Sequence, residues 1–134
     1  MRYDVRAMSY HFSKTLDLPF GQAVKRATEA LSKEGFGVLT DIDVAATMKK
    51  KLGRDFRPYR ILGACNPQLA YRALTLEDKI GTMLPCNVIV QQHDGGVEVS
   101  AVDPVASMQA IQNPDLAEVA KEVRAKLKRV IDSL

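Results

Sequence analysis

The sequence predicts a two-layer sandwich in which helices pack on a sheet that is at least partly antiparallel. Short segments with a β-strand pattern alternate with amphipathic helical segments along the chain. The turn from His93 to Gly96 contains Asp-Gly and Gly-Gly pairs and joins two valine-rich segments as an antiparallel hairpin. A doubly wound parallel sheet is disfavoured, because the second and third helical segments are too short to cover both sheet faces.

Length and composition indicate one globular domain over residues 1–134. The chain is 46% hydrophobic and 26% charged, which excludes a disordered protein, and its net charge of +3 is too small to indicate nucleic acid. No apolar run could span a bilayer, and the charged N-terminus is not a secretory signal. We therefore expect a cytoplasmic protein with reduced thiols. Residues 1–8 are expected to form a poorly patterned extension, with Met8 as an alternative start.

The first strand and the first helix are predicted from alternation and from helical periodicity. Residues 9–17 alternate in part and predict a strand. Asp17 is a candidate cap for a helix that begins near Pro19. Apolar residues then recur every 3.6 residues until Gly35, which is expected to end the helix.

The second strand and helix follow directly. Residues 36–43 predict a strand, and Asp43 at its end is a favoured cap for the next helix. That helix is expected to place apolar residues on one face as far as Leu52, and to end at Gly53.

The middle of the chain contains the strongest helix start. Residues 54–58 form a polar connector, and residues 59–65 predict a strand. Asn66 followed by Pro67 combines a cap residue with proline at the first helical position. The buried face of this helix is expected to hold Leu69, Ala70, Ala73 and Leu74. Residues 75–81 are expected to form a loop or a last helical turn.

The last third of the chain contains the hairpin and the clearest helix. Residues 84–93 and 97–102 predict its two strands, Asp103 and Pro104 end the second, and a loop runs to Asn113. The final helix carries one continuous apolar stripe, formed by Leu116, Val119, Ala120, Val123, Leu127, Val130, Ile131 and Leu134. Such a stripe normally packs on a sheet, and a dimer contact is the alternative interpretation.

The two cysteines are the main candidates for a site, because each precedes an asparagine near a strand end. Cys65 lies just before the helix that Asn66 caps, so its sulfur could lie near a helix N-terminus, where a thiolate is favoured. The alternative is that Cys65 is a small buried hydrophobe. Cys86, followed by Asn87, begins another strand, where a structural role is the simpler interpretation.

Other polar residues give weaker signals. Asp41 lies inside a predicted strand and faces either solvent or the same cleft as the cysteines, whereas Asp103 is a turn residue. His11 and His93 with the two cysteines make a poor zinc set, so no metal and no cofactor are expected. The basic cluster at residues 49–57 is typical of a solvated helix end, and we expect no nucleic-acid or membrane partner.

Four segments in order resemble the domain-of-unknown-function 302 family. They are Gly35-Phe36-Gly37-Val38-Leu39-Thr40-Asp41-Ile42-Asp43, Tyr59-Arg60-Ile61-Leu62-Gly63-Ala64-Cys65-Asn66-Pro67, Leu84-Pro85-Cys86-Asn87-Val88 and Val102-Asp103-Pro104. The resemblance implies a small α+β domain with a curved, mainly antiparallel sheet, a topology similar to that of the TATA-binding protein, and a homodimer. It implies no reaction, because function depends on sites and not on folds.

Three classes of function remain. We favour a dimeric module that binds a small molecule or a protein in a cleft near Cys65, Asn66, Cys86 and Asn87. The second class is a thiol-dependent enzyme or redox sensor that uses Cys65, with Cys86 as resolving partner. A nucleic-acid binder that uses the basic cluster is the third. The sequence leaves open whether the chain is an enzyme.

Overall fold

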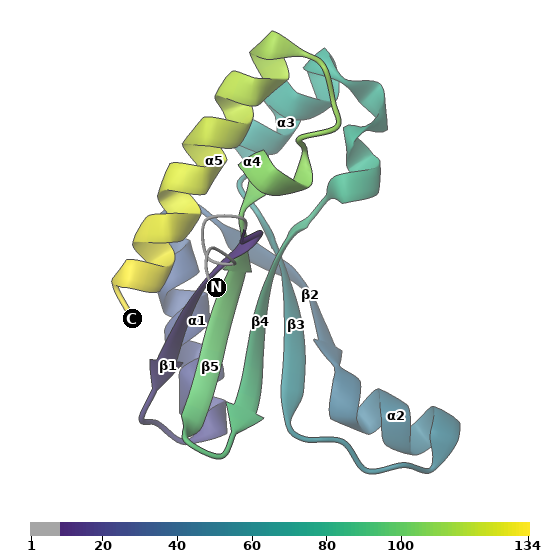
Figure 1. The fold of residues 1–134 in the computed structure, drawn as a ribbon, viewed down its shortest axis with the longest axis vertical. Helices are drawn as coiled ribbons and strands as arrows, with labels where there is room; N and C mark the ends of the chain where they lie inside the picture. Colours follow the sequence, from purple (N-terminus) through teal and green to yellow (C-terminus); the bar gives the residue numbers. More distant parts are fainter. Residues whose placement is uncertain (1–8) are drawn as a thin grey trace, which may run out of the picture.

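The computed structural model describes residues 9–134 and is built on one five-stranded sheet. The strand order is β1-β5-β4-β3-β2, and each neighbouring pair is antiparallel (Figure 1). The strands are β1 (His11–Leu16), β2 (Gly37–Asp43), β3 (Tyr59–Cys65), β4 (Cys86–His93) and β5 (Gly96–Val102). The predicted α+β class with an antiparallel sheet is confirmed.

Helices lie on one face of this sheet and beyond its upper end (Figure 1). The two long helices are α1 (Phe20–Lys33), which lies behind the strands in Figure 1, and α5 (Pro114–Asp132), which runs along the upper left. The shorter elements are α2 (Val44–Leu52), α3 (Pro67–Leu76), η2 (Asp78–Met83) and α4 (Pro104–Ser107). Helix α3 packs against α5, whereas α2 projects from the β2 side of the sheet. No helix in residues 9–134 covers the opposite face, which we call the open face.

The core lies between the sheet and the two long helices because side chains alternate across each strand. Val97, Val99 and Ala101 of β5 are buried on the helix side, and β4 places Val88 and Val90 beside them. The apolar stripe of α5 is buried, and this helix packs on β5 and β1 of the sheet, as predicted, and also against α1, α3 and α4. The buried residues of the stripe are Leu116, Val119, Ala120, Val123, Leu127, Val130 and Ile131. The intervening residues of the strands point to the open face.

Most predicted helix boundaries are confirmed by their caps. The Asp43 carboxylate accepts a hydrogen bond from the Ala46 amide at 2.9 Å, and Gly53 ends α2 in the left-handed conformation. The prediction that Asp17 caps α1 is wrong, since Pro19 occupies the cap position without a side-chain hydrogen bond. Pro19 has φ of −58° and ψ of 148°, the extended backbone that is usual for the residue before a helix.

The segment between β5 and α5 differs from the predicted loop. Residues 104–107 form the short helix α4, and the Asp103 carboxylate caps it by accepting from the Val105 amide at 3.0 Å. The other carboxylate oxygen accepts from Arg124 Nε of α5 at 3.1 Å, so Asp103 is more than the predicted turn residue. One buried carboxylate thereby ties α4 to α5.

Two features of β2 and β3 distinguish this side of the sheet. The register between the strands shifts between Val38 and Thr40, which leaves Leu39 without a partner and 68% exposed, as in a β-bulge. Opposite the bulge, Gly63 packs so closely against Thr40 and Pro85 that a Cβ atom would lie 2.7 Å from Pro85 Cγ. The backbone path at this end of the sheet therefore depends on a residue without a side chain.

The N-terminal extension of residues 1–8 and the alternative start at Met8 lie outside the described residues. Among the helices of residues 9–134, none has the combination of length and apolar character that crossing a bilayer requires.

Candidate functional site

The junction of β3 and α3 positions Cys65 and Asn66. The Asn66 side-chain oxygen accepts from the Leu69 amide at 3.3 Å, and its Nδ2 donates to the Glu34 carbonyl at 3.5 Å. Asn66 therefore caps α3 as predicted and joins it to the end of α1. Gly35, with φ of 84°, lies against this amide, and a Cβ at Gly35 would be 3.0 Å from Nδ2. The polar atoms of Asn66 thus serve the fold.

Cys86 begins β4 directly beside this junction. It pairs with Ala64 of β3, so Cys65 and Cys86 lie on neighbouring strands, and neither forms a disulfide. Burial raises the pKa of the Cys86 thiol to about 11, and electrostatic repulsion from nearby Cys65 contributes in the same direction. Cys86 is therefore a neutral thiol at neutral pH, whereas Cys65 is the more exposed of the two.

Both cysteines line one cavity of about 290 Å³ at the upper end of the sheet. Leu69 and Ala73 of α3 form one wall, and Leu116 and Ala120 of α5 form another. Residues 84–86, which lead into β4, also line the cavity. Asn66 is the one lining residue whose side chain carries nitrogen or oxygen. The space suits an apolar molecule, because the polar atoms of Asn66 already form hydrogen bonds with Leu69 and Glu34.

Leu74 departs from the predicted buried face of α3. Leu69 and Ala73 are buried and Ala70 is half-buried, but Leu74 is 44% exposed. It lines the rim of the cavity instead of packing in the core. The side of α3 that periodicity predicts to be buried therefore opens in part onto this space.

Asn87 and Asp41, the other predicted site residues, do not join this cavity. Asn87 follows Cys86 on β4 and therefore points to the open face, where it lines a shallow basin with Tyr59 and Ser100. Asp41 lies on the edge strand β2 and pairs with Arg60 of β3. Of the five predicted site residues, the structure brings together Cys65, Asn66 and Cys86.

The pair of Asp41 and Arg60 is bidentate. Arg60 Nε donates to Asp41 Oδ1 at 2.7 Å, and Nη2 donates to Oδ2. These hydrogen bonds hold the pKa of the Asp41 carboxyl below its ordinary value, although partial burial opposes them. The carboxylate has an ion-pair partner and joins the edge strand to β3.

Asp41→Asn is expected to lower the free energy of unfolding at pH 7 by less than about 1 kcal/mol, because the pair is partly exposed. A lowered folded-state pKa stabilises the protein above the unfolded value of about 3.9, and this contribution is lost as pH falls through the folded pKa. Urea unfolding at about pH 7 and about pH 2 should therefore show a difference between variant and parent only at the higher pH. Asp55→Asn, which alters an exposed pair with Lys49, is the matched control. A difference that persists at the lower pH would contradict the assignment.

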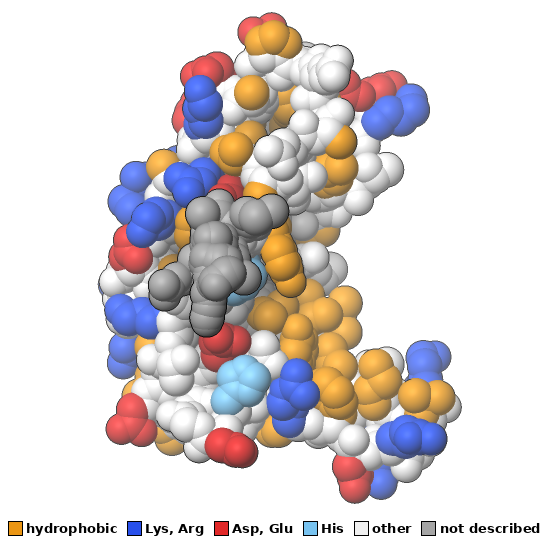
Figure 2. All heavy atoms as spheres, in the orientation of Figure 1, with side chains coloured by type: hydrophobic (Ala, Val, Ile, Leu, Met, Phe, Trp, Pro, Cys, Tyr) orange, Lys and Arg blue, Asp and Glu red, His pale blue; other side chains and the backbone are white. Residues whose placement is uncertain are grey.

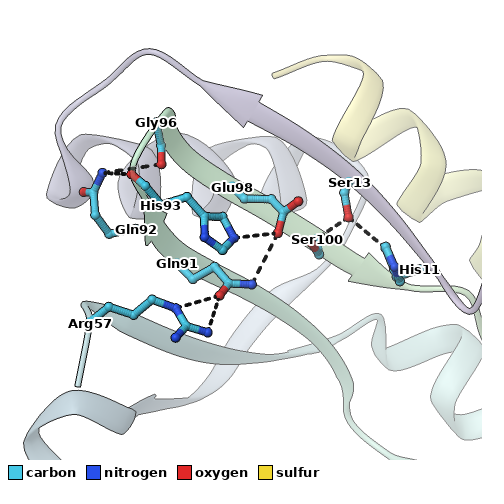
Figure 3. Close-up of polar contacts among 9 residues, drawn as sticks. All are labelled: His11, Ser13, Arg57, Gln91, Gln92, His93, Gly96, Glu98 and Ser100. Atoms are coloured by element: carbon cyan, nitrogen blue, oxygen red, sulfur yellow. Dashed lines mark hydrogen bonds and ion pairs between the residues drawn. The ribbon is translucent and has the colours of Figure 1, made fainter. Parts of the chain in front are cut away.

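The open face carries a polar network that the sequence interpretation missed (Figure 3). Arg57 Nε and Nη2 donate to Gln91 Oε1 at 3.0 and 2.9 Å, and Gln91 Nε2 donates to Glu98 Oε1 at 3.3 Å. His93 Nε2 lies 3.4 Å from the same carboxylate oxygen. The sequence pattern that indicates this network is the alternation of side chains along a strand, which places Asn87, Ile89 and Gln91 on one face of β4.

A second polar group lies on the β1 side of the same face. The Ser13 and Ser100 hydroxyls are 2.7 Å apart, and His11 Nδ1 lies 2.7 Å from Ser13 Oγ (Figure 3). The two histidines thus contact different partners on the open face. Within residues 9–134, no three His, Cys, Asp or Glu side chains are grouped to hold a metal ion.

Comparison with known proteins identifies the family. The model of Domain of unknown function DUF302 matches residues 12–134. This chain belongs to that family. The DUF302 domain described here is similar to the crystal structure of the uncharacterized conserved protein DUF302 from Bacillus stearothermophilus, with 31% sequence identity and a TM-score of 0.85. The match covers 92% of this chain and 96% of that chain. Among curated proteins, none matches.

Proposed function

We propose that this DUF302 domain is a binding module for an apolar small molecule, which occupies the cavity beside Cys65 and Cys86. The observation that carries the proposal is the cavity itself, about 290 Å³ in volume and apolar apart from Asn66. Its volume is near the lower end of the range typical of small-molecule sites, roughly 300 to 1,000 Å³. Two thiols in the wall add polarisable surface that suits aromatic or sulfur-containing groups.

The proposed module acts as a cytoplasmic homodimer without a nucleic-acid partner. Free thiols at both cysteines are consistent with a reducing compartment. Arg57, within the basic cluster, lies 4.6 Å from the Phe56 ring centroid and 5.6 Å from that of Tyr59. These aromatic faces are engaged by the chain's own guanidinium, which argues against base stacking at this place.

Filling the cavity tests the proposed site. Ala120→Leu adds three carbons to the wall formed by α5, and Ala125→Leu makes the same change on the exposed side of that helix. The parent and Ala125→Leu are expected to increase the fluorescence of N-phenyl-1-naphthylamine, a neutral apolar probe, whereas Ala120→Leu should bind it at least about ten-fold more weakly. Because the added carbons fill space, Ala120→Leu should also retain its stability or gain up to about 2 kcal/mol.

The outcome of this titration decides the location of the site. Equal probe binding by Ala120→Leu and the parent would place the apolar site elsewhere, for example on the open face. Absence of probe binding by the parent would contradict an apolar-ligand module. Thermal unfolding of each variant shows whether lost binding reflects a filled cavity or a disturbed fold.

A thiol-dependent enzyme or redox sensor is the second candidate. What favours it is the placement of Cys65 and Cys86 on adjacent strands in the wall of one cavity. In this function Cys65 is the reacting thiol, because Cys86 is buried and has a raised pKa. The relative reactivity of the two thiols tests it.

A further inference from the structure

The part of the open face formed by β2, β3 and β4 and the projecting segment that follows β2 together carry one contiguous apolar surface, which the rest of residues 9–134 leaves exposed or half-buried. We call residues 44–58, which comprise α2 and the connector to β3, the arm. Figure 2 shows hydrophobic side chains gathered over the middle of the sheet and continuing along the arm. The exposed or half-buried members are Ile42, Val44, Met48, Leu52, Phe56, Tyr59, Ile61 and Ile89. We propose that this surface is the interface with a second copy of this chain.

Burial in the arm supports a missing partner. Helix α2 has nine residues and buries none of them, and Leu52 is 63% exposed. Helices of this length are marginal in water and normally depend on tertiary packing of an apolar face. Phe56 and Ile42, 41% and 48% exposed, extend the apolar surface from α2 back to the sheet. A contiguous apolar surface of this kind marks an interaction site, unlike scattered single residues.

Charge selects a second copy of the chain as the partner. The arm holds five basic residues, Lys49, Lys50, Lys51, Arg54 and Arg57, and one acidic residue, Asp55. The β4–β5 hairpin, residues 86–102, holds Asp94 and Glu98 and neither Lys nor Arg. In Figure 2 the basic arm lies at the lower right and acidic side chains lie at the lower left of the same face. One chain therefore carries both halves of a complementary pair.

A two-fold axis that lies in front of β4 and runs parallel to the strands pairs the basic arm of each copy with the acidic hairpin of the other. Rotation about it places the second copy face to face with the first and lays each basic arm over the other copy's acidic hairpin. Ile61 and Ile89, neighbours on β3 and β4, then lie near the axis as the apolar centre, with charged residues at the rim. Such an isologous contact uses the same surface twice.

This proposal rests on the homodimer in the proposed function and specifies which surface forms it. Separate measurements therefore test the dimer and the interface. Sedimentation equilibrium of the parent should give about twice 14.8 kDa. Ile89→Lys places two like charges near the axis and should yield a monomer with an unchanged circular dichroism spectrum. Leu76→Lys, which alters an exposed leucine of α3 away from this surface, should remain dimeric.

Two charge variants test the pairing of arm and hairpin. Lys50→Glu combined with Lys51→Glu should weaken the dimer about ten-fold, since each change occurs twice by symmetry. Asp94→Asn keeps an Asn-Gly turn and should weaken the parent dimer about three-fold. In the background of the arm variant the same Asp94→Asn change should strengthen the dimer, because it removes like-charge repulsion.

The possible results distinguish failure of the proposed interface from failure of the homodimer itself. A parent that sediments as a monomer at high micromolar concentration overturns both the dimer and its interface, and leaves the cavity proposal standing. A dimer that is insensitive to Ile89→Lys and shows no change of sign for Asp94→Asn overturns the interface alone. Monomeric Ile89→Lys together with the change of sign supports the arrangement described here.

Discussion

Gly63→Ala is expected to destabilise the folded protein by about 2 to 3 kcal/mol, the usual magnitude when a well-packed site is overfilled. Gly63 lies in β3 opposite Thr40 of β2 and Asn87 of β4. A Cβ would overlap the Thr40 hydroxyl and lie 2.7 Å from Pro85 Cγ. Neither neighbour is the free end of a long side chain, so relief requires movement of the strands.

A matched glycine and a compensating change isolate this cause. Gly37 of β2 has open space where a Cβ would lie, so Gly37→Ala should change the free energy of unfolding by less than about 0.5 kcal/mol. Adding Thr40→Ala to Gly63→Ala should restore part of the loss, because the hydroxyl is the nearer obstacle. Equal effects of Gly63→Ala and Gly37→Ala in urea unfolding would contradict the packing described for this end of the sheet.

Cys86 is expected to react with iodoacetamide at about pH 8 at least about 100-fold more slowly in the folded protein than in the denatured chain. Only the thiolate reacts, and a pKa of about 11 leaves about one thiol in a thousand ionised at that pH. An unperturbed thiol, with a pKa near 8.5, is about one quarter ionised. Burial of the sulfur slows access as well, so the ratio of rates should exceed the ionisation effect alone.

Variants that keep a single cysteine show which thiol is responsible for each rate of alkylation. Cys65→Ser leaves Cys86 as the sole thiol, and since burial is the main cause of its raised pKa, the slow reaction should persist. Cys86→Ser leaves Cys65, which is more exposed and should be labelled faster than Cys86. If Cys65 also reacts only in denaturant, both cysteines are core residues and the thiol-dependent alternative is excluded. Rapid labelling of Cys86 in the folded protein would contradict its neutral, buried state.

The fold could be predicted in large part from local signals. The Asp-Gly turn, the Asn66-Pro67 helix start and the stripe of α5 each depend on neighbouring residues, and each is present in the structure. Helix α4 was missed because a four-residue helix has no periodicity to detect. The strand order was not accessible either, since it depends on which distant segments pair.

The candidate site could be predicted only in part, for a geometric reason. The two Cys-Asn pairs predict one cleft that all four residues share. Consecutive residues in a strand face opposite sides, however, so Cys86 and Asn87 are separated by the sheet. Asn66 stays with Cys65 because the chain turns there into α3. The residues of α5 that line the cavity, such as Ala120, have no sequence feature that distinguishes them from other apolar helix residues. Their place at the cavity depends on tertiary packing.

The bulge in β2 affects the tendency of this protein to aggregate at high concentration. As one of the two edge strands of the sheet, β2 presents backbone groups that a strand from another molecule could extend, the first step toward fibrils. The shift between Val38 and Thr40 interrupts that regular row of hydrogen-bonding groups, and Asp41 and Asp43 add charge to the same strand. Continuous addition of strands is thereby obstructed at the β2 edge, the edge that carries Ile42 of the exposed apolar surface.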